Sequence, residues 1–246
     1  MTGEGTAAAA PALLTVEGLE ARYGRARILA GLNLSVAPGE VVVLLGRNGA
    51  GKSTTLKAIM GLVPPAAGSV LFEGRDLAGE PPFRIARAGL GYVPEERRIF
   101  AGLTVRENIA VGMRPPPAGQ SPGWTEERLF ALFPSLGALR DRPAGRMSGG
   151  EQQMLAIART LAGNPRLLLL DEPSEGLAPV VVERLAEAVR ALRAEGLGVL
   201  LSEQNLRFAA AVGDRALILE TGAIRWEGAL STVLADEALR ARYLAV

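Results

Sequence analysis

The chain lacks cysteine and histidine altogether among its 246 residues. The absence of cysteine excludes a disulfide framework and any zinc site built on thiolates. The absence of histidine excludes imidazole from every catalytic and metal-binding role, so that proton transfer must depend on other side chains.

Long hydrophobic runs are also missing, since no apolar stretch approaches the roughly 20 residues that a membrane-spanning helix needs. The N-terminal stretch Thr6–Leu14 is short and Ala-rich, contains Pro11 and follows Glu4 rather than basic residues. This pattern predicts a disordered tail over residues 1–12 and not a signal peptide. We therefore expect a cytoplasmic protein.

Charge of one sign is not concentrated anywhere in the chain. The formal net charge is +1, and the arginines are scattered, which argues against a nucleic-acid partner. Only two lysines, Lys52 and Lys57, accompany 25 arginines, a bias that codon usage explains. One of these two lysines nevertheless lies in the clearest motif of the sequence.

That motif is Gly-Arg-Asn-Gly-Ala-Gly-Lys-Ser at residues 46–53, a complete phosphate loop between the apolar run Val41–Leu45 and the helix-like Thr54–Met60. Glycines let the loop amides wrap phosphates, and the helix that follows directs its positive end at the same anion. Lys52 reaches the β- and γ-phosphates, and the Ser53 hydroxyl can bind Mg²⁺. The alternative is a glycine-rich turn that binds nothing. Because the complete motif lies between a buried strand and a helix, we expect nucleoside triphosphate binding. The predicted contacts are Gly46, Arg47, Asn48, Gly49, Ala50, Gly51, Lys52, Ser53 and Thr54.

Two carboxylates, Asp171 and Glu172, directly follow the apolar run Leu167–Leu170. The carboxyl end of a buried strand is where α/β sheets place their ligands. Asp171 can hold Mg²⁺ opposite Ser53, and Glu172 is a candidate general base for the attacking water. Acidic pairs at strand ends are common, so this interpretation depends on the phosphate loop.

A second anion site is indicated at Ser148-Gly149-Gly150-Glu151, which begins an amphipathic helix with a capping box. Bare amides, a hydroxyl and the helix dipole converge there. An ordinary helix cap and a phosphate site are compatible, because an outward-facing cap is what a phosphate would use. The spacing does not place Ser148 beside Lys52 in the same molecule.

The order of expected elements predicts an α/β fold over residues 13–246 in one domain. Residues 13–36 are expected to form antiparallel strands with a turn over Glu20–Arg27, and residues 84–160 a mostly helical insertion. A capping box at Thr104–Glu107 opens one of its helices. Further expected strands are Val41–Leu45, Gly68–Phe72, Leu167–Leu170, Gly198–Leu201, and a hairpin of Ala216–Glu220 and Ala223–Glu227.

Taken together, the phosphate loop, Ser148-Gly-Gly, the Asp171-Glu172-Pro173 strand end and the turn over Ser174–Ala178 resemble the ABC-type ATPases from about residue 13 to 240. The resemblance implies a phosphate-loop core with an N-terminal antiparallel β subdomain and a helical insertion. It implies a head-to-tail dimer in which ATP lies between one subunit's phosphate loop and the other's Ser148, Gly149, Gly150 and Glu151. It also implies that Tyr23 stacks on adenine, although a surface aromatic is the alternative.

The sequence departs from the common ABC pattern at four positions. Glu95 and Glu151 stand where the family usually has glutamine. Ala178 stands in place of the usual aspartate, and Gln204 in place of the usual histidine. The resemblance then implies that Glu95 joins Ser53 and Asp171 around Mg²⁺, and that Gln204 is catalytic beside Glu172. Such departures also fit a degenerate ATPase, but Lys52, Ser53, Asp171 and Glu172 are all intact.

The same departures are typical of one subfamily, the smaller ATPase subunit of bacterial branched-chain amino-acid importers, with urea and amide importers as near relatives. The motifs that carry this are Val93-Pro94-Glu95-Glu96-Arg97-Arg98-Ile99-Phe100, Pro173–Pro179 and Glu203-Gln204-Asn205. It implies membrane permease partners contacted through about Glu95–Met113, a second ATPase subunit that is identical or paralogous, and a place on the cytoplasmic face of the inner membrane. A soluble ABC ATPase acting on nucleic acid or ribosomes is the competing class, and the sequence does not identify the solute.

Overall fold

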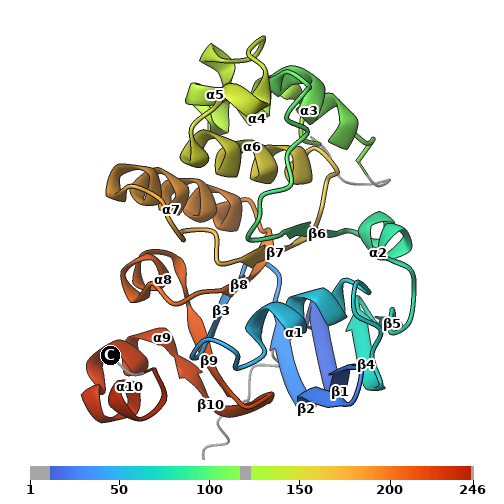
Figure 1. The fold of residues 1–246 in the computed structure, drawn as a ribbon, viewed down its shortest axis with the longest axis vertical. Coiled ribbons are helices and arrows are strands. Elements are labelled where there is room, and N and C mark those ends of the chain that lie inside the picture. The colour runs from blue at the N-terminus through green and yellow to red at the C-terminus, as the bar shows by residue number, and fades with distance from the viewer. Residues whose placement is uncertain (1–11, 117–122, 245–246) are drawn as a thin grey trace, which may run out of the picture.

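The computed structural model describes residues 12–116 and 123–244. The tail predicted over residues 1–12 therefore lies outside the described residues except for Ala12. The described chain builds two sheets and a set of helices, with the helices α3 to α6 gathered at one end of the molecule (Figure 1).

The N-terminal sheet is antiparallel, with strand order β2-β1-β4-β5. Leu14 is opposite both Val36 and Phe72 in its two neighbouring strands, and all three side chains are buried. The turn expected over Glu20–Arg27 is wrong, because β1 and β2 stay paired as far as Tyr23 and Ala26. Only two residues form the connection, and Gly24 adopts the positive φ that such a tight turn requires. The strands are β1 (Leu14–Tyr23), β2 (Ala26–Val36), β4 (Ala67–Phe72) and β5 (Arg75–Asp76).

The second sheet forms the core, with order β10-β9-β3-β8-β7-β6. All of its pairs are parallel except β9 with β10, which form the predicted hairpin. Every residue of β3, β7 and β8 is buried, as expected of parallel strands covered on both faces. The strands are β3 (Val41–Leu45), β6 (Leu90–Val93), β7 (Leu167–Asp171), β8 (Gly198–Ser202), β9 (Arg215–Glu220) and β10 (Ala223–Ala229).

Strand β6 was not expected, since Leu90–Val93 falls inside the range predicted as mostly helical. It pairs with β7 at the edge of the core sheet. Four residues that include a glycine are too few to show a periodicity, so only the tertiary pairing reveals this strand. The helices beyond it begin with α3.

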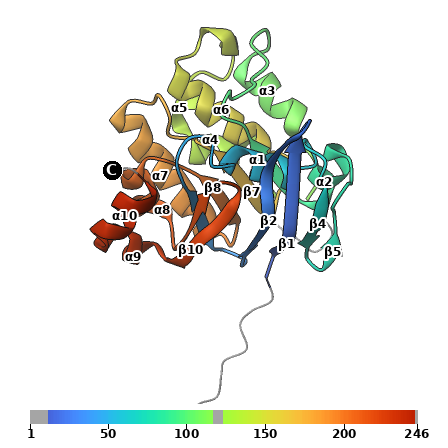
Figure 2. The ribbon, with the colours of Figure 1, turned by 60° about the horizontal axis from the view of Figure 1, so that its bottom comes forward.

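Two hydrophobic cores lie on opposite faces of the core sheet. Along β3, Val41, Val43 and Leu45 pack with the helices α3 to α9, whereas Val42 and Leu44 pack with the N-terminal sheet and α1. This alternation follows from the two-residue period of a strand. Figure 2 shows α9 and α10 on the opposite side of the molecule from β4 and β5. The helices are α1 (Lys52–Ile59), α2 (Pro82–Ala88), α3 (Val105–Gly112), α4 (Glu126–Leu132), α5 (Pro134–Ala138), the 3₁₀ helix η1 (Ala144–Arg146), α6 (Gly149–Leu161), α7 (Pro179–Ala194), α8 (Leu206–Val212), α9 (Leu230–Ala235) and α10 (Glu237–Tyr243).

Both predicted capping boxes are confirmed. Thr104 accepts a hydrogen bond from Glu107 N, and the Glu107 side chain accepts one from Thr104 N. Ser148 and Glu151 make the same reciprocal pair at the start of α6. Helices α3 and α6 therefore begin where the sequence indicates.

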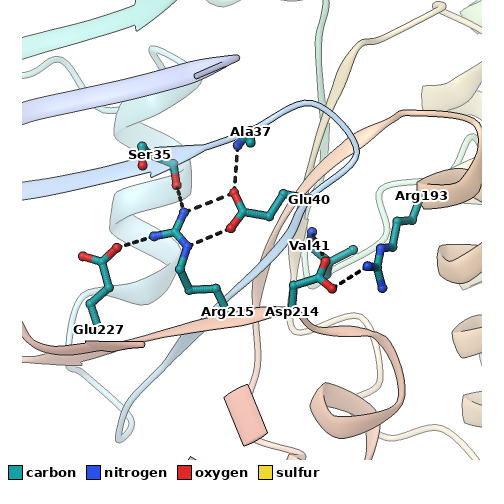
Figure 3. Close-up of polar contacts among 8 residues, drawn as sticks. All are labelled: Ser35, Ala37, Glu40, Val41, Arg193, Asp214, Arg215 and Glu227. Carbon is teal, nitrogen blue, oxygen red and sulfur yellow. Dashed lines mark hydrogen bonds and ion pairs between the residues drawn. The ribbon is translucent and has the colours of Figure 1, made fainter. Parts of the chain in front are cut away.

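A network around Arg215 joins the two sheets at the amino end of β3 (Figure 3). Arg215 Nε donates to Glu40 Oε1 at 2.7 Å, and Nη2 donates to the carbonyl oxygen of Ser35 at 2.7 Å. A further ion pair links Arg215 to Glu227 on β10. Burial acts against the charged form of Glu40, but its bonds with Arg215 and Ala37 N hold the pKa of that carboxyl below its ordinary value.

The neighbouring Asp214 fixes β3 itself. Its Oδ2 accepts the backbone N–H of Val41 at 3.0 Å, and its Oδ1 lies 2.6 Å from Arg193 Nη2 on α7 (Figure 3). The amino end of β3 is thus held by charged groups, while its carboxyl end leads into the phosphate loop.

Candidate functional site

The phosphate loop leaves β3 through three glycines with positive φ angles, 153° at Gly46, 79° at Gly49 and 111° at Gly51. A β-carbon on Gly46 would collide with the carbonyl oxygen of Leu219. Gly51 precedes α1 as its N-cap and offers no side chain to the first amides of the helix. These amides therefore face the loop without a capping group, which is the arrangement that binds phosphate.

Lys52 is the first residue of α1, and its side chain is only 4% exposed. Its Nζ donates to the carbonyl oxygens of Gly46 at 2.9 Å and Arg47 at 3.4 Å, and lies 3.3 Å from Glu172 Oε1. A buried ammonium requires such partners. Phosphate oxygens can replace these partners, because a phosphate supplies the negative charge that a buried ammonium requires.

Ser53 and Asp171 meet across the loop. Ser53 Oγ donates to Asp171 Oδ1 at 2.9 Å, and the hydroxyl of Tyr92 on β6 donates to Oδ2 at 3.1 Å. Burial raises the pKa of Asp171, and the bonds from Ser53 and Tyr92 oppose that shift. Burial and the Asp171 charge both raise the pKa of Tyr92, so this phenol stays a donor.

The donor set at Ser53 and Asp171 fits Mg²⁺. No three acidic, cysteine or histidine side chains gather as a metal site within residues 12–116 and 123–244. A hydroxyl and one carboxylate therefore suit an ion that takes its remaining ligands from phosphate oxygens and water, as Mg²⁺ does.

Glu172 follows β7 in the left-handed backbone region, with a φ of 44°. Its Oε2 accepts a hydrogen bond from Gln204 Nε2 at 2.6 Å, while Oε1 faces Lys52. The carboxylate is therefore held between an amide and an ammonium. A strained backbone at this position is maintained by the surrounding contacts and is common at functional sites.

Glu203 is a functional candidate that the sequence interpretation did not identify as a site residue. It is buried directly after β8, and its carboxylate accepts the backbone N–H groups of Ser174 at 3.1 Å, Gln204 at 2.9 Å and Asn205 at 2.8 Å. Burial raises its pKa, against these bonds. Glu203 holds the loop that carries Gln204 to the turn after Glu172. A charged residue two positions after the wholly apolar run 198–201 is the signal that could have indicated it.

A cavity of about 460 Å³ brings most of the predicted nucleotide residues together. Glu95, which lies just beyond β6, also lines it, and so does Glu175, which interacts with Glu172. Burial and the nearby charges of Glu172, Glu95 and Glu203 raise the pKa of Glu175. The lining residues are Ile28, Asn48, Gly49, Gly51, Lys52, Ser53, Thr54, Glu95, Glu172, Glu175 and Gln204.

Tyr23 does not share this lining among the residues that the structure describes. It lies at the end of β1 with 51% of its surface exposed, so an adenine could stack on it only from outside the cavity. Its stacking role stays a prediction. Of the other loop residues, Arg47 is exposed and Ala50 is buried.

The Ser148-Gly149-Gly150 element lies at the start of α6, in the helical part and away from α1 (Figure 1). Ser148 is exposed, and Glu151 Oε2 accepts from its backbone N–H at 2.7 Å and its hydroxyl at 2.9 Å. A β-carbon on Gly150 would lie 2.7 Å from Val181 Cγ1, so packing also requires a glycine there. The structure thus places the two predicted phosphate sites in different parts of the chain.

Comparison with known proteins gives consistent matches over most of the chain. A family model described as ABC transporter matches residues 29–175. The high-affinity branched-chain amino acid transport ATP-binding protein BraG of Pseudomonas aeruginosa is 41% identical over 241 residues, covering 94% of this chain and 99% of that protein. The lipopolysaccharide export system ATP-binding protein LptB of Escherichia coli K12 is 37% identical, covering 95% and 97%.

Solved structures agree with this fold. The crystal structure of a nucleotide-free ATP-binding cassette from an ABC transporter superposes with a TM-score of 0.80 at 28% identity, covering 93% of this chain and 97% of that one. Within the described residues, no helix has the length and apolar character to cross a bilayer.

Proposed function

The chain belongs to the ABC transporter family and is an ATP-hydrolysing ATPase subunit, and from this premise we propose that it drives the import of branched-chain amino acids through a membrane permease. The observation that carries the solute assignment is the 41% identity with BraG over almost the full length of both chains. BraG is by name a branched-chain amino acid transport protein.

The contacts around Glu172 support the following course of hydrolysis. In the chain without nucleotide, Lys52 Nζ lies against Glu172 Oε1. When ATP binds, its β- and γ-phosphates take the Lys52 ammonium, which frees that carboxylate oxygen. Glu172 then accepts a proton from water as the water oxygen bonds to the γ-phosphorus and the bond to the ADP oxygen breaks. Gln204 keeps the carboxylate oriented through its 2.6 Å hydrogen bond.

Ser53 and Asp171, whose side chains hydrogen-bond to each other, would hold Mg²⁺, and Glu95 lines the same cavity as Ser53. When bound, Mg²⁺ would neutralise the charge that develops on the phosphate oxygens. Tyr92 orients Asp171 from the other side.

The second half of the ATP site is proposed to come from another ATPase subunit, identical or paralogous, arranged head to tail. The exposed start of α6 supports this, since Ser148, Gly149 and Gly150 are absent from the described lining of the phosphate-loop cavity. A dimer with two-fold symmetry would present each α6 to the opposite loop.

The permease is proposed to dock where large apolar side chains remain exposed around α2 and α3. Phe83, Phe100, Val111 and Met113 are each at least 40% exposed. Pro82 and Gly112, which are chain neighbours of these residues, line a cavity of about 270 Å³ together with residues of β6 and α6. Apolar side chains gathered in this way mark interaction surfaces, and this one would hold the chain on the cytoplasmic face of the membrane.

The solute proposal is tested by uptake in the source cell. Deleting the gene for this chain should abolish high-affinity uptake of radiolabelled leucine, isoleucine and valine, and the wild-type gene should restore it. The Glu172→Gln gene, made at the same level, should not. Loss of urea or amide uptake with normal leucine uptake would instead identify one of the related importers.

Lipopolysaccharide export is the second candidate, because LptB of Escherichia coli is 37% identical over nearly the same span. The same deletion strain separates the two. An exporter defect would leave leucine uptake intact and make the outer membrane permeable to large antibiotics. We favour import because BraG is more similar to this chain than LptB is, at 41% against 37% identity, and because the match includes 99% of the BraG sequence.

A further inference from the structure

Arg97 lies in the loop that leaves β6 and carries Glu95. The loop turns sharply, since Arg97 N donates to the carbonyl oxygen of Pro94 at 3.0 Å and the φ angles of Arg97 and Arg98 are 62° and 47°. The loop is also tied to α6, because Arg159 Nη2 donates to the carbonyl oxygen of Arg98 at 2.8 Å. The position of Arg97 relative to α6 is therefore fixed by the fold.

The Arg97 guanidinium lies against the start of α6. A β-carbon placed on Gly149 would be 2.8 Å from Arg97 Nη1, 3.4 Å from Cζ and 3.5 Å from Nη2. The absence of a side chain at Gly149 is what lets the guanidinium approach the helix start. Arg97 is thereby brought to the amides and hydroxyl of the Ser148-Gly149-Gly150 element.

This guanidinium has no counter-charge. Arg98 pairs with Glu96 at 3.6 Å, whereas the partly buried Arg97 side chain makes no hydrogen bond or ion pair with the part of the chain that the structure describes. The N-terminus of a helix is itself a centre of positive potential. A cation packed there without an anion is unfavourable, and an anion bound between the two would relieve it.

We propose that Arg97 binds the γ-phosphate of the ATP held by the second ATPase subunit, together with Ser148, Gly149 and Gly150. This inference rests on the proposed head-to-tail arrangement and adds a residue to its phosphate site. A guanidinium offers two parallel N–H donors that match phosphate oxygens, which makes it well suited to this ligand.

The loop then touches two nucleotides. Glu95 lines the cavity of its own subunit, and Arg97, two residues later, faces the nucleotide of the other subunit. The residues assigned to the two nucleotides are thus only two positions apart in the chain.

The test measures ATP-driven dimer formation in the Glu172→Gln background, where hydrolysis does not remove the ligand. Sedimentation is measured over a range of ATP concentrations with Arg97→Ala, with Arg98→Ala as the matched control and with the parent chain. If the physiological dimer contains a paralogue, the purified pair is used. Arg97→Ala should weaken dimerisation roughly 10- to 100-fold, as expected for the loss of a charge-assisted hydrogen bond. Arg98→Ala removes the same charge from the same loop and should leave dimerisation within about twofold of the parent, because its side chain is exposed and paired with Glu96.

Binding of a fluorescent ATP analogue to the monomer and the thermal unfolding midpoint accompany each variant. Both should be unchanged in Arg97→Ala, because this residue contributes to the other subunit's ligand. Dimerisation equal to that of the parent would overturn the role of Arg97, and so would an equal loss in Arg98→Ala. A parent chain that stays monomeric in ATP would overturn the head-to-tail arrangement, and the role of Arg97 with it.

A mixture of chains tests the assignment to the second subunit. When Arg97→Ala chains are mixed with Lys52→Ala chains in an otherwise wild-type background, mixed dimers should hold one intact site and recover ATPase activity. Arg97→Lys should behave between wild type and Arg97→Ala, since an ammonium keeps the charge and loses the paired donors. No recovery in the mixture would show that Arg97 serves its own subunit's nucleotide.

Discussion

The two regions proposed to bind phosphate differ in how complete they are. Around the phosphate loop, Lys52, Ser53, Asp171 and Glu172 already bind one another within one subunit, and Lys52 is almost fully buried. At the start of α6, Ser148 is exposed, and within the described chain its side chain hydrogen-bonds only to Glu151.

The difference separates two tasks. The phosphate loop is organised before nucleotide binds, so binding exchanges existing contacts for new ones and loses little conformational entropy. In the proposed head-to-tail dimer, the α6 site contributes only when another subunit brings a nucleotide to it. One subunit can therefore be prepared for binding, while completion of the site depends on association. The four predictions below test this contrast.

The largest effect is expected for Glu172→Gln. The amide keeps the size of the side chain and loses the basic oxygen, so turnover should fall at least ~10²-fold while ATP binding remains. Steady-state phosphate release and equilibrium ATP binding measure the two quantities. Turnover near the wild-type rate would remove Glu172 from the role of general base.

Glu203→Ala and Glu151→Ala compare two carboxylates that hold backbone N–H groups. Glu203 is buried and holds the loop after β8, whereas Glu151 completes the capping box of α6. Removing Glu203 leaves the backbone N–H groups of Ser174, Gln204 and Asn205 without their acceptor, which should lower the free energy of unfolding by about 2–3 kcal/mol. Removing Glu151 breaks an exposed capping box and should cost about 0.5–1 kcal/mol. Urea denaturation of both variants gives the comparison, and equal losses would contradict it.

Gln204→Ala should slow turnover roughly tenfold, because Glu172 loses one charge-assisted hydrogen bond and its fixed orientation. ATP affinity should change little. Gln204→His should keep much of the rate, since imidazole can also donate to the carboxylate, and a new titration should then appear near pH ~6.5. Full activity of Gln204→Ala at saturating ATP would mean that the amide has no part in catalysis.

The smallest effect comes from mixing Lys52→Ala chains with Ser148→Arg chains. Each variant alone should be inactive. Because the two lesions fall in the same composite site of a mixed dimer, an equal mixture should regain about a quarter of the wild-type rate if the two sites act independently. Crosslinks between cysteines introduced at Gly49 and Gly149 that form only within single chains would contradict the shared site.

The sequence predicted those parts of the site that depend on residues close together in the chain. The phosphate loop lies between a strand and a helix as expected, and Asp171 and Glu172 end a buried strand. The capping boxes at Thr104 and Ser148 were predicted for the same reason, since an N-cap is determined within four residues. The α/β fold with its antiparallel subdomain is confirmed by the similar cassettes.

The parts that could not be predicted depend on contacts between distant segments. Tyr92 bonds Asp171 across 79 positions because β6 pairs with β7, and β6 is too short to be recognised alone. Glu203 was visible only as part of a motif until its three amide partners were located. The turn expected after Glu20 was wrong because pairing with β2 outweighs a locally polar sequence.

The charged network at the amino end of β3 has a mechanical consequence. Strand β3 has five residues, roughly 17 Å of extended chain, between the Val41 amide that Asp214 holds and the loop that meets the nucleotide. Arg215 and Asp214 tie this end of the strand to both sheets and to α7, which opposes sliding of β3 along its neighbours. The phosphate loop therefore starts from a strand whose far end is anchored.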